Sequence, residues 1–507
     1  MKHTNIKPLR QVARNGLATI LCASLFASSL SGGVVYAQPV GLPNIGAASS
    51  SELSPLVEAE LGAAIMAQGR SDPTFIDDPE VTQYLTNMGR HLASFAPSGS
   101  PDVALFAVRD PEINAFAMPG GYIGINSGLV VSSRSESELA GVIAHEIGHV
   151  TQRHIARGMT QQNQSGAIMM ATLAAALAAA LAGGGGNLAV GVAAFGQAAA
   201  INRQLGFSRD AEREADRVGF QMLTRAGYNP QGMADMFALL MNASRLNEGQ
   251  GGGAWASTHP LSIERLSDIQ NRSRAMTSSA YVDSDDYAYI RARLRVLQGR
   301  DRNAQRTIDQ QFNDEARSLT GVRQSAAYYG LALLALNAKD IPLAQQHFNQ
   351  ASPPGRLSPI LAKLGIDIAI ARKDNAGALA AAQAAIGRWP DRRALGLVYA
   401  QTLLNAGQNQ QALDFLRART KTWAEEEPRA YQLLALSEER MGDPIAARRD
   451  MARYYVSIGA LPAAESQLQQ ARKMTSDFYE QSQIDVQVRE IRDRIEAQRQ
   501  LLERFKK

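Results

Sequence analysis

The feature that most constrains this chain is a pair of histidines, four residues apart, inside an apolar run. His145 and His149 frame the sequence His-Glu-x-x-His, and residues four apart share one face of an α-helix. A helix here would therefore point two imidazoles at one metal ion. Zinc suits such a pair, because neutral imidazole binds it well and a catalytic site keeps one position open for water. Glu146 between the two histidines could then take a proton from the attacking water.

The residues around the motif favour a helix. Ser135 and Glu138 have the Ser-x-x-Glu spacing of a capping box, and apolar residues then recur at helical spacing (Leu139, Val142, Ile143 and Val150). Short motifs also arise by chance. The alternative is therefore a helix whose two histidines are solvated or satisfied within the protein.

A second charged helix could complete the metal site. Two histidines need a third protein ligand, and a carboxylate from a later helix commonly supplies it. Ser208 is a good N-cap, and Glu212 and Asp216 then lie one turn apart on one face. Asp216 could accept a hydrogen bond from a ligating imidazole and fix its tautomer. Glu214 points elsewhere, and without the upstream motif this run would suggest only a solvated helix.

Two further histidines lie near these segments in the sequence. His154 follows His149 by five residues, about 500° around a continuous helix, so we expect it beside a ligand or at the surface and not on the metal. His259 lies where a glycine-rich loop, residues 249–253, meets a helix. It could donate to a tetrahedral oxyanion, or it could close the fourth zinc position and silence the site.

Three short strands are predicted before the metal helix. They cover residues 103–108, 113–117 and 122–126, with Pro119-Gly120-Gly121 turning the chain between the last two. An edge strand beside the metal helix could pair with a peptide substrate through main-chain hydrogen bonds. A purely structural hairpin fits the sequence equally well.

Residues 166–201 form an alanine-rich stretch with a glycine interruption at 183–186. The apolar part before the glycines, 167–182, is short for a membrane span, and alanine is only weakly lipophilic. We expect a buried or interfacial helical hairpin. Contact with a membrane surface is the alternative, because so much apolar length near an active site is unusual.

The last part of the chain carries a repeat. Alanines recur every 34 residues, at Ala344, Ala378, Ala412 and Ala446, which is the period of tetratricopeptide repeats. Each unit would be a helix pair that buries its inner face only by stacking on its neighbours. Residues 478–507 are charged and amphipathic and would cap the array.

The first 37 residues have the features of a cleavable signal peptide. A basic start and an apolar stretch lead to Val35-Tyr36-Ala37; an uncleaved anchor is the alternative. The only cysteine, Cys22, would be removed with this segment, leaving no disulfide and no thiolate ligand. The four basic residues removed with it reduce the net charge from +4 to zero. Nothing in this balance suggests a nucleic-acid partner.

The signal peptide, the metal motifs and the repeats, in this order, resemble a zinc metallopeptidase family that includes HtpX and the CAAX prenyl endopeptidase. The resemblance is to the members of that family that carry repeats and act in the Gram-negative periplasm. The resemblance implies a mainly α fold: an α+β, gluzincin-like zincin domain over residues 38–278, then an α-solenoid of tetratricopeptide repeats over 279–507. It implies one Zn²⁺ held by His145, His149 and Glu212.

The same resemblance implies catalytic roles and partners. Glu146 would be the general base and acid, Asp216 would support a ligand, and His259 would be the loop histidine that can hold the enzyme latent. Residues 114–117 would be the substrate-facing edge strand. Misfolded or stalled outer-membrane proteins would be the substrates, and the repeat array would dock on the barrel assembly machinery.

A second function is compatible with the same residues. The chain could be an assembly scaffold or chaperone with a latent or structural zinc site. Glu146 argues against a purely structural site, because a structural zinc needs no base between its ligands.

Overall fold

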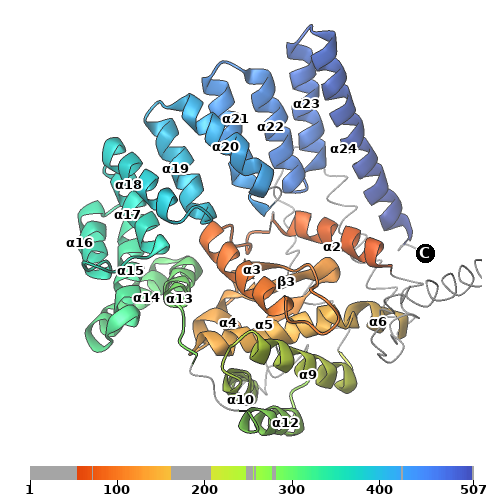
Figure 1. Cartoon of the computed structure of the whole chain (residues 1–507), viewed down its shortest axis with the longest axis vertical. Helices are drawn as coiled ribbons and strands as arrows, with labels where there is room; N and C mark the ends of the chain where they lie inside the picture. Colours follow the sequence, from red (N-terminus) through yellow and green to blue (C-terminus); the bar gives the residue numbers. More distant parts are fainter. Residues whose placement is uncertain are drawn as a thin grey trace, which may run out of the picture. The chain divides into compact units, whose positions relative to one another are not determined.

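The computed structural model describes residues 54–70, 72–161, 207–246, 255, 259–276, 281–423 and 426–504. The predicted signal peptide (1–37) and the alanine-rich stretch (166–201) lie outside these residues. Within the described segments, no helix is both long enough and apolar enough to cross a bilayer. Figure 1 shows the arrangement of the helices and the small sheet.

The sheet has three strands, close to the predicted positions. β1 (Ala104–Val108) pairs in parallel with β3 (Tyr122–Asn126), and β2 (Ala115–Ala117) pairs antiparallel with the other side of β3. β2 is therefore an edge strand, two residues shorter than predicted. The turn after it, η3 (Pro119–Gly121), contains Gly120 and Gly121 at φ 75° and 81°, a backbone conformation that favours glycine.

Helices α2 and α3 both begin with a proline, a residue favoured at the first helical position. α2 spans Pro55–Gly69 and packs on η3. α3 spans Pro79–Ala93, and its N-cap Asp78 accepts hydrogen bonds from the amides of Glu80 and Val81. Its apolar face packs against β1 and buries Leu85 and Leu92 completely. Each such leucine contributes roughly 1.5–3 kcal/mol of hydrophobic stabilisation.

The metal-motif helix is α5 (Glu136–Thr151), which follows the short helix α4 (Ser127–Ser132). Ser135 caps α5 by accepting from the Glu138 amide at 3.2 Å. The other half of the expected capping box is not made, because the Glu138 carboxylate accepts from the Arg134 amide at 2.7 Å, one residue earlier. α5 packs against α9 (Arg209–Arg225) and α10 (Gln231–Leu246), with α12 (Ile263–Arg274) covering α10.

The expected continuation of α5 to residue 154 is wrong. The helix ends at Thr151, and Arg153 adopts a left-handed backbone with φ 51°. A new helix, α6 (His154–Gln161), then begins. The sequence has no glycine or proline there to mark the break.

The rest of the chain is an array of antiparallel helices. Consecutive helices lie side by side along it (Figure 1): α13 (Asp285–Gln298), α14 (Arg302–Ser318), α15 (Gly321–Asn337), α16 (Ile341–Ala351), α17 (Pro359–Ala371), α18 (Asn375–Arg388), α19 (Arg393–Asn405), α20 (Asn409–Trp423), α21 (Pro428–Arg440), α22 (Pro444–Ser457), α23 (Leu461–Met474) and α24 (Phe478–Arg504).

The 34-residue spacing corresponds to a repeated packing position in this array. Ala344, Ala378 and Ala412 each lie in the first turn of the second helix of a pair and are buried. At the fourth position Ala446 is half-buried, and the next residue, Ala447, is buried in its place. The predicted fold class, mainly α with a small sheet in the first part and stacked helix pairs in the second, is confirmed. The tetratricopeptide assignment stays a prediction.

The helices after residue 279 are joined to the preceding part of the chain by charged contacts. Arg293 on α13 lies 2.7 Å from Asp78 and 2.9 Å from Glu80, at the start of α3. α13 packs against α3 and α4 as well as α15. The predicted boundary at residue 278 stays a prediction.

Candidate metal centre

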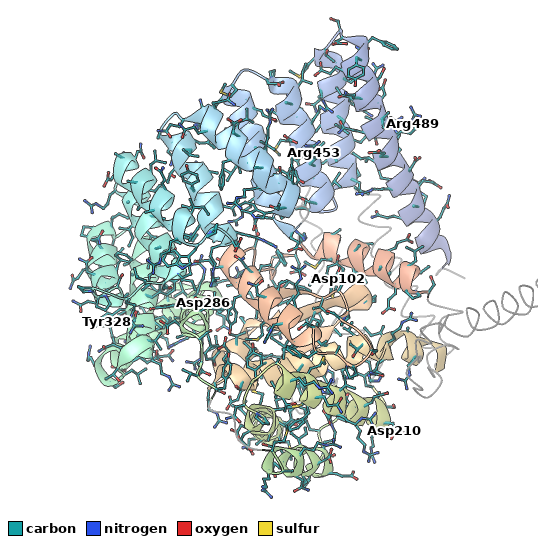
Figure 2. All side chains as sticks on the ribbon, viewed as in Figure 1. Asp102, Asp210, Asp286, Tyr328, Arg453 and Arg489 are labelled. Atoms are coloured by element: carbon teal, nitrogen blue, oxygen red, sulfur yellow. The ribbon has the colours of Figure 1, made fainter. Side chains whose placement is uncertain are left out.

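Four buried side chains converge beside α5. His145 and His149 come from α5, Glu212 comes from α9, and His259 comes from the segment before α12. One ligand atom from each lies within 4.8 Å of the others. Asp210, labelled in Figure 2, marks the exposed start of α9, whereas Glu212 two residues later faces inward and is fully buried.

Several distances among these side-chain atoms are close to the spacing of ligands around one metal ion. His145 Nε2 lies 3.1 Å from His149 Nε2, 3.4 Å from His259 Nδ1 and 3.6 Å from Glu212 Oε2. Glu212 Oε1 lies 3.4 Å from His149 Nε2 and 3.0 Å from His259 Nδ1. Four ligands bound to zinc at about 2.0–2.1 Å would lie about 3.3 Å apart. Three imidazoles and one carboxylate of this spacing fit a tetrahedral metal ion.

Two glycines allow the ligand-bearing helices to approach closely. A Cβ at Gly148 of α5 would meet the Ala215 carbonyl oxygen of α9 at 2.8 Å. One at Gly219 of α9 would meet the Ala144 carbonyl oxygen of α5 at 2.9 Å. Side chains at either position would separate the helices and move Glu212 away from the histidines.

His145 is supported from behind by a carboxylate and a guanidinium. Its Nδ1 lies 2.9 Å from Asp216 Oδ1, the partner that the sequence suggested for a ligating imidazole. Arg265 of α12 donates to both Asp216 oxygens, at 2.7 and 2.8 Å. Burial alone would raise the pKa of Asp216, but the hydrogen bonds from Arg265 and His145 outweigh it and lower the pKa. This placement agrees with the role predicted for Asp216, a carboxylate that would hold the proton of His145 on Nδ1 and leave Nε2 for a metal.

Glu146 lies next to the four ligand atoms and is fully buried. Burial raises its pKa, and the opposing effects of His259 and His145 do not cancel that shift. Its Oε1 is 3.4 Å from His259 Nε2. α5 packs against β2, so this carboxyl also lies beside the edge strand. A raised pKa suits a group that must accept and then release a proton near neutral pH.

His259 lies at the fourth corner of the cluster. Its ring stacks on Trp255, with ring centroids 4.3 Å apart and the planes at 26°. Burial alone would lower its pKa, but the charges of Glu212 and Glu146 raise it. Of the two roles considered from the sequence, closing the fourth position agrees with this placement.

His154 is buried against His149, so it lies beside a candidate ligand, one of the two positions expected for it. Because α5 ends at Thr151, the ring returns to the site, and its Nδ1 lies 2.9 Å from His149 Nδ1. Its Nε2 lies 3.1 Å from Glu214, the carboxylate that points away from the metal.

Sequence reasoning missed two other residues at this centre. Arg265 lies in a helix whose composition suggests only a solvated surface, and Trp255 lies next to a glycine-rich run. No spacing rule connects either residue to the motif, because their contacts depend on how α12 folds back over α9.

Comparison with known proteins agrees with this geometry. The model of peptidase family M48 matches residues 79–273, which include all four cluster residues. The beta-barrel assembly-enhancing protease of Escherichia coli K12 is 31% identical over 98% of this chain and 99% of its own length. The protein of the same name from Yersinia pestis is 30% identical over 97% of this chain and 99% of its own length.

This chain belongs to peptidase family M48.

A further relative matches a smaller share of the chain. The mitochondrial metalloendopeptidase OMA1 of Schizosaccharomyces pombe is 34% identical over 37% of this chain and 52% of its own length. The M48 chain described here is a metalloendopeptidase. The family implies a metal ion, and the cluster of three imidazoles and one carboxylate is suited to hold it.

Proposed function

We propose that this M48 chain is a periplasmic zinc endopeptidase acting in the quality control and assembly of outer-membrane β-barrel proteins. The observation that carries the catalytic part is the convergence of His145, His149, Glu212 and His259, with Glu146 in contact. Zinc is the metal that tetrahedral sites of imidazole and carboxylate ligands most commonly hold.

Each residue has a distinct role in this proposal. His145, His149 and Glu212 would hold one Zn²⁺, which, when bound, lowers the pKa of a coordinated water and polarises the scissile carbonyl. Glu146 would take the proton from the attacking water and deliver it to the leaving amine. Asp216 would keep His145 in its metal-binding tautomer.

His259 would hold the enzyme latent. At 3.0 Å from Glu212 and 3.4 Å from Glu146, its ring fills the space that water and substrate need. Its displacement would open the fourth position and release Glu146. The freed imidazole could then donate a hydrogen bond to the oxyanion.

The substrate class and the partners rest on the relatives and on the sequence. Two relatives that match nearly the whole chain are named for enhancing β-barrel assembly, and the predicted signal peptide would export the chain to the periplasm. Stalled or misfolded outer-membrane proteins would be the substrates. The array, as tetratricopeptide repeats, would dock on the barrel assembly machinery, and residues 166–201 could contact the membrane surface.

A scaffold or chaperone role is the second candidate, and the position of His259 favours it. With its fourth corner closed by a protein ligand, the site would not cleave, and the chain would act through binding alone. The two functions could alternate, with His259 deciding between them.

Casein cleavage by the zinc-loaded chain tests the proposal. We expect His259→Ala to cleave faster than wild type, and Glu146→Gln to lose cleavage by about 10²–10⁴-fold while keeping its zinc. If all three proteins bind zinc and are equally inert, the scaffold role is favoured. If Glu146→Gln cleaves as fast as wild type, the assigned general base is wrong.

A further inference from the structure

The two histidines of α5 are supported in different ways. Behind His145 lies a carboxylate, Asp216. Behind His149 lies another imidazole: the two Nδ1 atoms of His149 and His154 are 2.9 Å apart. The far nitrogen of His154, Nε2, is 3.1 Å from Glu214 Oε2, and Arg157 lies 2.9 Å from the same oxygen. A row of one carboxylate and two rings therefore ends at the metal-facing nitrogen of His149.

The positions of the protons on the two imidazoles follow from the Glu214 carboxylate at the end of the row. The Glu214 carboxylate, paired with Arg157, only accepts hydrogen bonds, so His154 Nε2 must carry a proton and donate it. In neutral His154 the other nitrogen, Nδ1, is then an acceptor. His149 Nδ1 must therefore be the donor in the 2.9 Å contact. That leaves His149 Nε2 without a proton and with its lone pair toward the metal position.

The backbone is shaped to place His154 there. In a continuous helix, a residue five positions after His149 would point away from it. Arg153, at φ 51°, breaks the helix so that the His154 ring returns to His149. A left-handed backbone at a non-glycine residue costs about 1 kcal/mol or more. The Arg153 side chain is held by an ion pair with Glu58 of α2 at 3.0 Å, which offsets part of this cost.

We propose that His154 is a positioning residue that fixes the orientation and the metal-binding tautomer of His149. Glu214 fixes the tautomer of His154 by accepting the hydrogen bond from its Nε2. This inference rests on the proposed function, because it assumes that His149 binds a metal. His154 touches neither metal nor substrate. Its loss should therefore weaken metal binding and distort the site before it changes substrate affinity.

Matched variants at residue 154 separate hydrogen bonding from packing. Asparagine carries its side-chain oxygen close to the position of His Nδ1, so His154→Asn keeps an acceptor for His149. His154→Leu has a similar shape and no acceptor. Glu214→Met removes the far carboxylate, and Glu214→Gln keeps an acceptor oxygen. Glu214 is partly exposed, so these two variants leave the fold intact even if a change at the buried residue 154 does not.

The measurements are zinc affinity by chelator competition, the visible spectrum of the Co²⁺-loaded protein, and kcat and KM for casein in the His259→Ala background. We expect His154→Leu to weaken zinc binding by about 10–100-fold, to shift the Co²⁺ bands and to lower kcat with KM nearly unchanged. His154→Asn should recover most of the affinity. Glu214→Met should lose more affinity than Glu214→Gln.

Three outcomes would overturn this assignment while the metal site itself stands. His154→Leu could bind zinc within twofold of wild type with an unchanged Co²⁺ spectrum. His154→Asn could lose as much affinity as His154→Leu, which would indicate packing alone. Glu214→Met and Glu214→Gln could be equivalent. Failure of the wild-type chain to bind zinc would instead contradict the proposed function.

Discussion

At the scale of single residues, Arg265 supplies a buried positive charge next to two carboxylates of the candidate metal centre. It is 5% exposed, and it contacts two buried carboxylates, Asp216 at 2.7 Å and Glu212 at 2.7 Å. The guanidinium neutralises groups that would otherwise be costly to bury. It also ties α12 to the helix that supplies the carboxylate ligand.

Removing this guanidinium should destabilise the chain strongly. We expect Arg265→Met to lower the free energy of unfolding of the metal-free protein by about 3–5 kcal/mol, because two buried carboxylates lose their partner. Arg213→Met on α9 is the matched control, since its partners, Asp210 and Glu264, are exposed. The control should change stability by no more than about 0.5 kcal/mol. Urea denaturation measures both, and equal effects of the two changes would contradict the account.

The sequence predicts some of these residues and not others, for a physical reason. His145, Glu146 and His149 follow from spacing on one helix, and Glu212 with Asp216 follows from spacing on another. Arg265 and Trp255 contribute through contacts between distant segments, which no local pattern encodes.

At the scale of elements, the beginnings of helices are better predicted than their ends. Ser208 caps α9 as expected, and Asp78-Pro79 begins α3 in the same way, because an N-cap side chain and a proline act locally on the first turn of the helix. The end of α5 was missed because Arg153 adopts a conformation that usually favours glycine. The chain there is held by contacts with distant segments: Arg153 pairs with Glu58 of α2, and His154 contacts Glu214 of α9. The local sequence does not encode these contacts.

At the scale of the whole molecule, two neighbouring carboxyl groups, Glu426 and Glu427, lie where the catalytic part meets the array. Their pKa values are shifted in opposite directions. Burial, together with the charge of Asp77, raises the pKa of Glu427 to about 7. For Glu426, burial alone would raise the pKa, but hydrogen bonds from Arg90 on α3 and from Arg393 on α19 outweigh it and lower the pKa.

These opposite shifts predict opposite effects of pH. Between the ordinary value of 4.5 and about 7, native Glu427 keeps a proton that the unfolded chain has lost. Its contribution to stability is therefore present at low pH and is lost as the pH rises toward 7. We expect Glu427→Gln to raise the free energy of unfolding by about 1–3 kcal/mol at pH 8 and to change it little at pH 5.

Glu426→Gln is the matched control. A lowered pKa stabilises the native state above pH 4.5, and this contribution is lost as the pH falls through the native pKa. The change should therefore destabilise the chain at pH 8 by about 0.5–1 kcal/mol, since the pair is partly exposed. Chemical denaturation at pH 5 and pH 8 measures the free energy of unfolding of both variants. A stabilising Glu426→Gln, or a neutral Glu427→Gln at pH 8, would count against these assignments.

The sequence predicts how the helices of the array stack on one another, but not how the array contacts the catalytic part. The 34-residue spacing predicts stacked helix pairs, because each repeat encodes its own packing face. It does not predict that α13 packs against α3 and α4, because that contact joins two patterns of different period.

In the proposed latent state, three imidazoles and one carboxylate hold one zinc ion. Zinc-edge X-ray absorption of the metal-loaded wild-type chain and of His259→Ala measures these ligands. We expect one zinc per chain with only nitrogen and oxygen ligands at about 2.0–2.1 Å. We also expect three imidazole ligands in the wild type and two in His259→Ala. A wild-type chain without bound zinc, or with an unchanged number of imidazoles after His259→Ala, would contradict the proposed latent state.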